Sequence, residues 1–169
     1  MLLASTSTNG GLTWSTPVLV NPPTDKAAFT GTIAVDRKGR VGVTYHDFTP
    51  PLTTPDILLT DTWFTSTSGP GLDFGPRRLI GGPYNMEAAP IARGFFVGDY
   101  EGLAARIGRE ASGPSSSIGQ DNGEGSAGFV PLFVMTNCKD NSCRAQFSLD
   151  GTPVGPDSTD TFTNVAPPD

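Results

Sequence analysis

The sequence is poor in charge and in the residue types that most often build reactive sites. Of its 169 residues only 17% are charged, one is histidine and two are cysteine. The low charge argues against a coiled coil and against a charge-driven disordered protein. Lysine and arginine form no basic patch, so we predict no nucleic-acid partner. A run of about 20 apolar residues is also missing, which predicts no membrane span.

The charge that is present is unevenly distributed. Residues 1–85 balance six basic against six acidic side chains, whereas residues 86–169 hold five basic and eleven acidic ones and carry the whole net charge of −6. The first residues, Met1 to Ala4, lack a charged start and are followed at once by polar residues. We therefore predict no signal peptide in this sequence.

Glycine and proline are frequent, with 21 and 16 copies, and predict many turns and little helix. Short segments rich in β-branched and aromatic residues lie between the turns. Arg37 to Arg40 is one such turn, in which Gly39 is free to adopt a positive φ. Four segments predict an antiparallel meander of strands: 31–36, 41–46, 57–65 and 77–80.

Parts of the same pattern recur on both sides of this meander. Residues 1–6 and 16–20 predict two strands joined by a turn, and a Gly/Ser-rich loop spans 111–128. Further strands are predicted at 99–106, 129–136 and 144–149. Repeated four-strand meanders are typical of a β-propeller, and this chain supplies about two and a half of them.

Residues 7–14, Ser-Thr-Asn-Gly-Gly-Leu-Thr-Trp, resemble the Asp-box, the repeat of bacterial neuraminidases. The family pattern is Ser/Thr-x-Asp-x-Gly-x-Thr-Trp/Phe. It is matched here by Ser7, Gly11, Thr13 and Trp14, with Asn9 in the aspartate position. We expect a structural turn in which Asn9 accepts hydrogen bonds from backbone amides and Gly11 has a positive φ. Trp14 is expected to pack between neighbouring strands.

Three further segments are similar to the sialidase-like family. Residues 66–74 resemble a degenerate second Asp-box with one extra residue, residues 32–47 resemble a hairpin common in these repeats, and residues 94–104 resemble a Gly-Asp-Tyr-x-Gly-Leu segment. The resemblance covers residues 1–149. It implies an all-β fold: an incomplete propeller of about two and a half four-stranded antiparallel blades from a six-bladed fold.

The resemblance also implies a domain organisation. Residues 1–20 would form half a blade, 27–80 a full blade and 94–149 a partial blade. Residues 150–169 form an acidic tail that contains proline, and we expect it to be poorly ordered.

The functions implied by the resemblance are carbohydrate-directed. The first is a fragment of an exo-α-sialidase-type glycoside hydrolase that acts on terminal sialic acid or a related sugar. The second is a non-catalytic repeat propeller that binds glycans or proteins. The third is a fragment that neither closes nor functions alone, and its open strand edges would favour self-association.

Sialidases of this kind use a tyrosine nucleophile, an assisting glutamate, an aspartate acid/base and three arginines that bind the substrate carboxylate. The end of the blades opposite the Asp-box turns would bring together the following residues: His46, Asp47, Asp56, Tyr84, Glu87, Asp99, Tyr100 and Glu101. We take Asp47, Glu87, Asp99 and Tyr100 as candidate catalytic residues, with Tyr100 beside Asp47 or Glu87. Asp99 also fits a structural role at a turn leading into a blade.

Other charged residues have structural alternatives. Arg93 and Arg106 fit remnants of the arginine clamp, or surface and packing arginines. An Arg-Ile-Pro motif, expected beside the first clamp arginine, is missing, so we expect the chain to be inactive alone. His46 fits a hydrogen-bonded loop residue better than a catalytic or metal-binding one. The aspartates at 47, 56 and 61 match no calcium loop, and we predict no metal and no cofactor.

Cys138 and Cys143 are separated by four residues. A disulfide across a small hairpin is the favoured interpretation, followed by two free thiols and then by a zinc site, which lacks a second ligand pair. A disulfide suits an exported protein. Together with the sialidase resemblance, it predicts an extracellular or cell-surface location for the parent protein.

Overall fold

The computed structural model of this chain describes residues 1–24, 27–48, 58–90, 94–98, 101–106 and 128–136, and the backbone of 159–163. Within these ranges the regular elements are antiparallel β-strands and one short 3-10 helix, η1 (Met86–Ala88). The predicted all-β fold with antiparallel pairing is confirmed. No helix in these ranges is long and apolar enough to cross a membrane.

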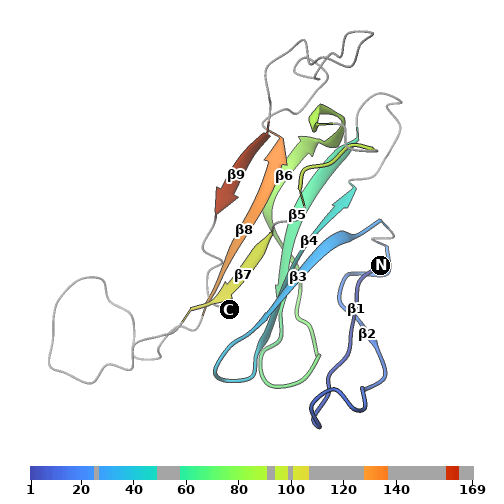
Figure 1. The fold of residues 1–169 in the computed structure, drawn as a ribbon, viewed down its shortest axis with the longest axis vertical. Helices are drawn as coiled ribbons and strands as arrows, with labels where there is room; N and C mark the ends of the chain where they lie inside the picture. Colours follow the sequence, from blue (N-terminus) through green and yellow to red (C-terminus); the bar gives the residue numbers. More distant parts are fainter. Residues whose placement is uncertain are drawn as a thin grey trace, which may run out of the picture.

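The strands form three sheets (Figure 1). The first pairs β1 (Leu3–Ala4) with β2 (Val18–Leu19). The central sheet has the order β3-β4-β5-β6, and the third has the order β7-β8-β9. The central strands are β3 (Phe29–Val35), β4 (Val41–Phe48), β5 (Leu59–Ser66) and β6 (Arg78–Asn85). The third sheet contains β7 (Gly102–Ala105), β8 (Phe129–Thr136) and β9 (Thr159–Thr163).

The central sheet is the meander predicted for residues 31–80. The Asp36–Arg40 turn joins β3 to β4, Gly39 has a φ of 77°, and Val35 pairs with Val41. β6 continues to Asn85, five residues past its predicted end, although glycine and proline interrupt it. Register shifts in its pairing with β5 accommodate these residues without ending the strand.

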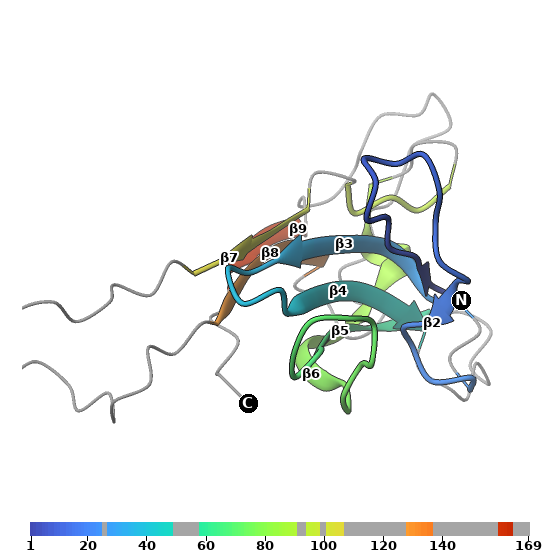
Figure 2. The same ribbon diagram turned by 90° about the horizontal axis from the view of Figure 1, so that it is seen from below.

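β4 lies at the centre of the molecule, with both of its faces covered. Its odd-numbered residues Val41, Val43 and Tyr45 pack with Ala4 and Val20 of the β1–β2 layer. Its even-numbered residues face the third sheet, which explains why seven of its eight residues are buried. Figure 2 shows the first and third sheets on opposite sides of the central one.

Two glycines allow the third sheet to approach the central sheet closely. A Cβ atom at Gly42 would lie 2.7 Å from the ring of Phe129. A Cβ atom at Gly81 would lie 2.7 Å from both Phe133 and the Met135 sulfur. The aromatic rings of β8 therefore occupy the space that side chains on β4 and β6 would otherwise fill.

The third sheet differs from expectation in its last strand. β8 pairs with Thr159–Thr163, which lies inside the tail that we expected to be poorly ordered. The alternating threonines of this segment have high strand propensity, and β8 offers an edge with which they pair. The predicted poor order of the tail stays a prediction. The strand predicted at 144–149 lies outside the described residues, as does the Gly/Ser-rich loop apart from Gly128.

Candidate functional site

Hydrogen bonds that involve side chains close the turn at residues 7–14, and in one of them a backbone amide donates to Asn9. The Asn9 side-chain oxygen accepts from the Thr13 amide at 3.0 Å, and its amide group donates to the Thr13 hydroxyl at 2.9 Å. The Ser7 hydroxyl oxygen accepts from the Gly11 amide at 2.8 Å, and Gly11 has a φ of 89°. Asparagine therefore satisfies the turn in place of aspartate.

Trp14 does not pack between strands as expected. It is 65% exposed, and its indole N–H donates to the Gly11 carbonyl oxygen at 3.1 Å. β1 and β2 contain two residues each and offer the ring little apolar surface. The ring therefore closes back over its own turn.

The segment 66–74, which resembles a degenerate Asp-box, connects β5 to β6. Thr67 bridges to Phe74, and the ring of Phe74 packs against the core cluster of Val41, Val43 and Tyr45. Phe74 thus makes the apolar contact expected of the last position of the repeat.

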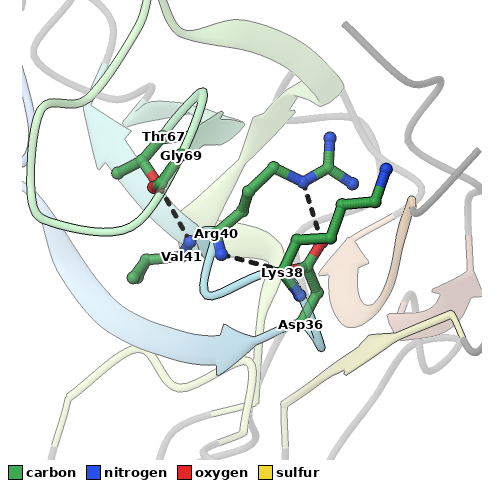
Figure 3. A network of polar contacts seen from close by, with 6 residues as sticks. All are labelled: Asp36, Lys38, Arg40, Val41, Thr67 and Gly69. Atoms are coloured by element: carbon green, nitrogen blue, oxygen red, sulfur yellow. Dashed lines mark hydrogen bonds and ion pairs between the residues drawn. The ribbon is translucent and has the colours of Figure 1, made fainter.

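This second turn lies at the same end of the sheet as the Asp36–Arg40 turn (Figure 3). The Val41 amide donates to the Thr67 hydroxyl oxygen at 2.9 Å, and that hydroxyl donates to the Gly69 carbonyl oxygen at 2.7 Å. A Cβ atom at Gly39 would lie 3.3 Å from Pro70. The two connections therefore support each other across the sheet.

Asp36 organises the first of these two turns. Its carboxylate accepts from the backbone amides of Lys38 and Arg40 at 2.9 Å each, and from the Arg40 guanidinium at 2.8 Å. Burial of Asp36 opposes its ionisation, but the hydrogen bonds from Arg40 and Lys38 and the charge of Arg40 outweigh it and lower the pKa of this carboxyl. Asp36 is therefore ionised and has a structural role.

The candidate catalytic residues belong to the opposite end, and the structure describes two of the four. Asp47 lies near the end of β4 on the same face as Tyr45, and Glu87 lies in η1 after β6. Asp99 and Tyr100 lie outside the described residues, as do Asp56, Arg93, Cys138 and Cys143. The preferred pairing of Tyr100 with Asp47 or Glu87 therefore stays a prediction.

Asp47 is buried, with 4% exposure, in a polar cluster on the face of β4 that carries Tyr45. It pairs across strands with Asp61, and its carboxylate lies 3.9 Å from the Arg77 guanidinium. That guanidinium also lies 3.7 Å from the centre of the Trp63 ring. Burial and the charge of Asp61 raise the pKa of Asp47 despite hydrogen bonds from the backbone. Burial and the charge of Asp47 likewise raise the pKa of the Tyr45 phenol.

Glu87 is half-buried and positioned by Asn85. The Asn85 side chain accepts hydrogen bonds from the Glu87 amide at 3.1 Å and from the Leu58 amide at 3.2 Å. It therefore caps η1 and connects the start of η1 to the residue that precedes β5. Arg106 is exposed, and its amide donates to the Gly128 carbonyl oxygen within the third sheet. Its exposed position fits the interpretation of Arg106 as a surface arginine.

Sequence analysis placed His46, Tyr84 and Glu101 at one end of the blades, and the structure brings these three residues together in a buried cluster. His46 lies in β4 rather than in a loop, is fully buried, and contacts the Glu101 carboxylate through Nε2 at 2.5 Å. Its Nδ1 lies 3.0 Å from the Thr62 hydroxyl and 3.1 Å from the Tyr84 hydroxyl. Burial and the charges of Glu101 and Asp61 raise the pKa of Tyr84. The alternation along β4 places His46 on the face of Gly42 and Thr44, and its direct contact with Glu101 goes beyond the expected grouping at one end of the blades.

A surface hollow in the described part of the chain is lined mainly by apolar residues. Its lining comes from β1, β3 and their neighbours and consists of Leu2, Leu3, Ala4, Ser5, Val20, Gly31, Thr32, Ile33 and Val43. Within the described ranges, no three His, Cys, Asp or Glu side chains converge on a point that would hold a metal ion. No family model, curated protein or solved structure matches this chain.

Proposed function

We propose that this chain is part of a sialidase-like Asp-box propeller whose parent protein is an exo-α-sialidase-type glycosidase. Its substrate would be terminal sialic acid or a related sugar outside the cell. The observation that carries the proposal is the turn at residues 7–14, where Ser7, Asn9 and Thr13 make the hydrogen bonds that explain the Asp-box pattern.

The arrangement of the sheets supports an incomplete propeller of about two and a half blades. A four-stranded antiparallel meander lies between two other sheets, and the three follow one another in chain order. Face-to-face packing of successive meanders is the way in which propeller blades pack.

The geometry of the described residues favours a chain that is inactive alone. The Tyr84 hydroxyl is hydrogen-bonded to His46 and the residue is only 2% exposed, so it is closed to substrate. Asp47 is buried beside Arg77. A glycosidase needs two carboxyl groups facing one accessible glycosidic bond, or a tyrosine with its base.

The same burial favours a second candidate, a non-catalytic propeller that binds glycans or proteins. In this alternative the polar residues of the blades stabilise the fold, and recognition takes place on the loops at the blade ends.

The test is hydrolysis of a fluorogenic sialoside by this chain and by the product of the longest open reading frame that contains it, with a glycan array for both. Activity of the longer protein alone would support the glycosidase. Activity of both would contradict the expected inactivity of this chain. If the folded longer protein binds glycans on the array but hydrolyses no sialoside, the binding propeller is favoured. If it shows neither hydrolysis nor binding, a carbohydrate-directed function is rejected.

A further inference from the structure

We propose that His46 and Glu101 form a proton-dependent latch, which holds the β7–β9 sheet against the central sheet. The latch is closed while the imidazole ring and the carboxylate carry opposite charges. This inference does not depend on the sialidase proposal, since it concerns how two sheets of this chain are joined.

The pair crosses the boundary between the two sheets. His46 belongs to β4, and Glu101 immediately precedes β7, 55 residues further along the chain. The Nε2–Oε1 distance is 2.5 Å, and the two side chains are 0% and 3% exposed. Water therefore does not screen this contact as it screens a surface ion pair.

The surroundings of the ring accept either of its protonation states. Thr62 of β5 and Tyr84 of β6 face Nδ1 with hydroxyl groups, which can donate to a bare nitrogen or accept from a protonated one. The remaining neighbours are apolar: Phe29 of β3 stacks on the ring with its centre 5.5 Å away, and Phe133 of β8 lies edge-on at 6.5 Å. Beyond this shell, the charge of Asp61 acts on Tyr84 together with that of Glu101.

Charge balance makes the strength of the His46–Glu101 contact depend on pH, and the contact weakens both on raising and on lowering the pH. A protonated ring beside an ionised Glu101 is a neutral pair. Loss of the ring proton leaves a buried carboxylate without a counter-charge, and protonation of Glu101 leaves a buried imidazolium without one. The contact is therefore strongest at an intermediate pH and weaker on both sides.

The β7–β9 sheet is the part of the molecule that we expect to open when the latch weakens. β7 has four residues and β9 five, and a sheet with such short outer strands depends on packing against a neighbour for its stability. When the latch weakens, this sheet opens more often than the central one, and the β7 amides exchange with solvent.

The test combines two measurements on the whole chain between pH 4 and pH 8, a range in which isolated glutamic acid and histidine side chains change charge. His46 is the only histidine, so the NMR signals of its ring report the charge state without assignment. Hydrogen exchange gives the protection of the Gly102–Ala105 amides relative to those of β4, corrected for intrinsic rates. We expect this ratio to pass through a maximum and to fall about tenfold as the ring loses its proton.

Variants separate the latch from a general loss of stability. Glu101→Gln keeps an acceptor for Nε2 without the charge, so a protonated ring has no counter-charge, and we expect the maximum to disappear and the ratio to rise as the ring loses its proton. If this variant does not fold, His46→Gln leaves an ionised Glu101 without a counter-charge, and we expect the ratio to fall as the pH rises. Asp36→Asn, at the far end of the central sheet, should keep the wild-type profile. A wild-type ratio that stays constant while the ring titrates would overturn the proposal, as would an unchanged profile in Glu101→Gln.

Discussion

Two buried carboxyl groups in the central sheet have opposite electrostatic environments. Asp36 receives three hydrogen bonds and a guanidinium charge, which lower its pKa. Asp47 is buried beside a second carboxylate, and its pKa is raised. Ionisation therefore stabilises the fold at Asp36 and costs stability at Asp47.

We predict that Asp36→Ala lowers the free energy of unfolding by about 1–3 kcal/mol at pH 7, because it removes a buried acceptor from three donors. The folded-state pKa lies below the ordinary value of 3.8, so this contribution is present above that value and is lost as the pH falls through the folded-state pKa. Urea unfolding at pH 7 and pH 3 measures the difference. Asp36→Asn keeps one acceptor and should therefore lose less stability than Asp36→Ala. An equal loss of stability at pH 7 and pH 3 in Asp36→Ala would refute the stabilising role of the ionised carboxylate.

Asp47→Asn is expected to change the free energy of unfolding in the opposite direction and to stabilise the protein by about 1 kcal/mol at pH 7. A raised folded-state pKa means that stability falls as the pH rises from 3.8 through the folded value. The gain should therefore disappear below pH 4. Thermal unfolding of this variant beside Asp73→Asn, at an exposed position, provides the comparison. A loss of stability at pH 7 would show that the contact with Arg77 outweighs the burial cost.

At the scale of elements, the packing of β8 on β4 depends on the missing side chain at Gly42. We predict that Gly42→Ala destabilises the protein by about 1–3 kcal/mol, because the new methyl group would lie within 2.9 Å of three ring atoms of the buried Phe129. Gly69→Ala is the matched control, since a Cβ atom there has no neighbour within 4 Å. Similar unfolding midpoints for both variants would mean that the two sheets are not in close contact.

The sequence predicted the elements whose determinants are local. The hairpin around Gly39 and the turn around Asn9 depend on residues a few positions apart, and both have the expected geometry. Specific contacts between distant segments were not predictable in this way. His46 and Glu101 were expected at the same end of the blades, but not in direct contact across 55 residues, and β9 pairs with β8 from a segment with an acidic, proline-containing composition. Strand pairing and layer packing depend on tertiary context, which single-sequence patterns do not contain.

At the scale of the whole molecule, the surface between β1 and β3 carries exposed apolar side chains. Leu3 and Ile33 line the hollow and are each more than half exposed, as is Val35 at the end of β3. A patch of this kind on a sheet edge favours association between copies. It also lies where further strands of the first blade would pack in the proposed propeller.

We therefore predict that this chain self-associates, with an average mass that rises with concentration in sedimentation experiments. Leu3→Ser combined with Ile33→Thr should weaken the association about tenfold or more. Leu12→Ser, which removes a leucine that is 84% exposed in the turn at residues 7–14, should leave it unchanged. A monomeric wild-type chain at high concentration would count against an open edge.

The central claim is that the three sheets are successive blades of a propeller. A crystal structure of the product of the longest open reading frame that contains this chain tests it most directly. We predict that additional strands fill the hollow beside β1 and that the sheets surround a common axis, with the central sheet as one complete blade. A structure in which the face of β1 and β3 stays open to solvent, or in which the sheets form a closed sandwich, would contradict the claim.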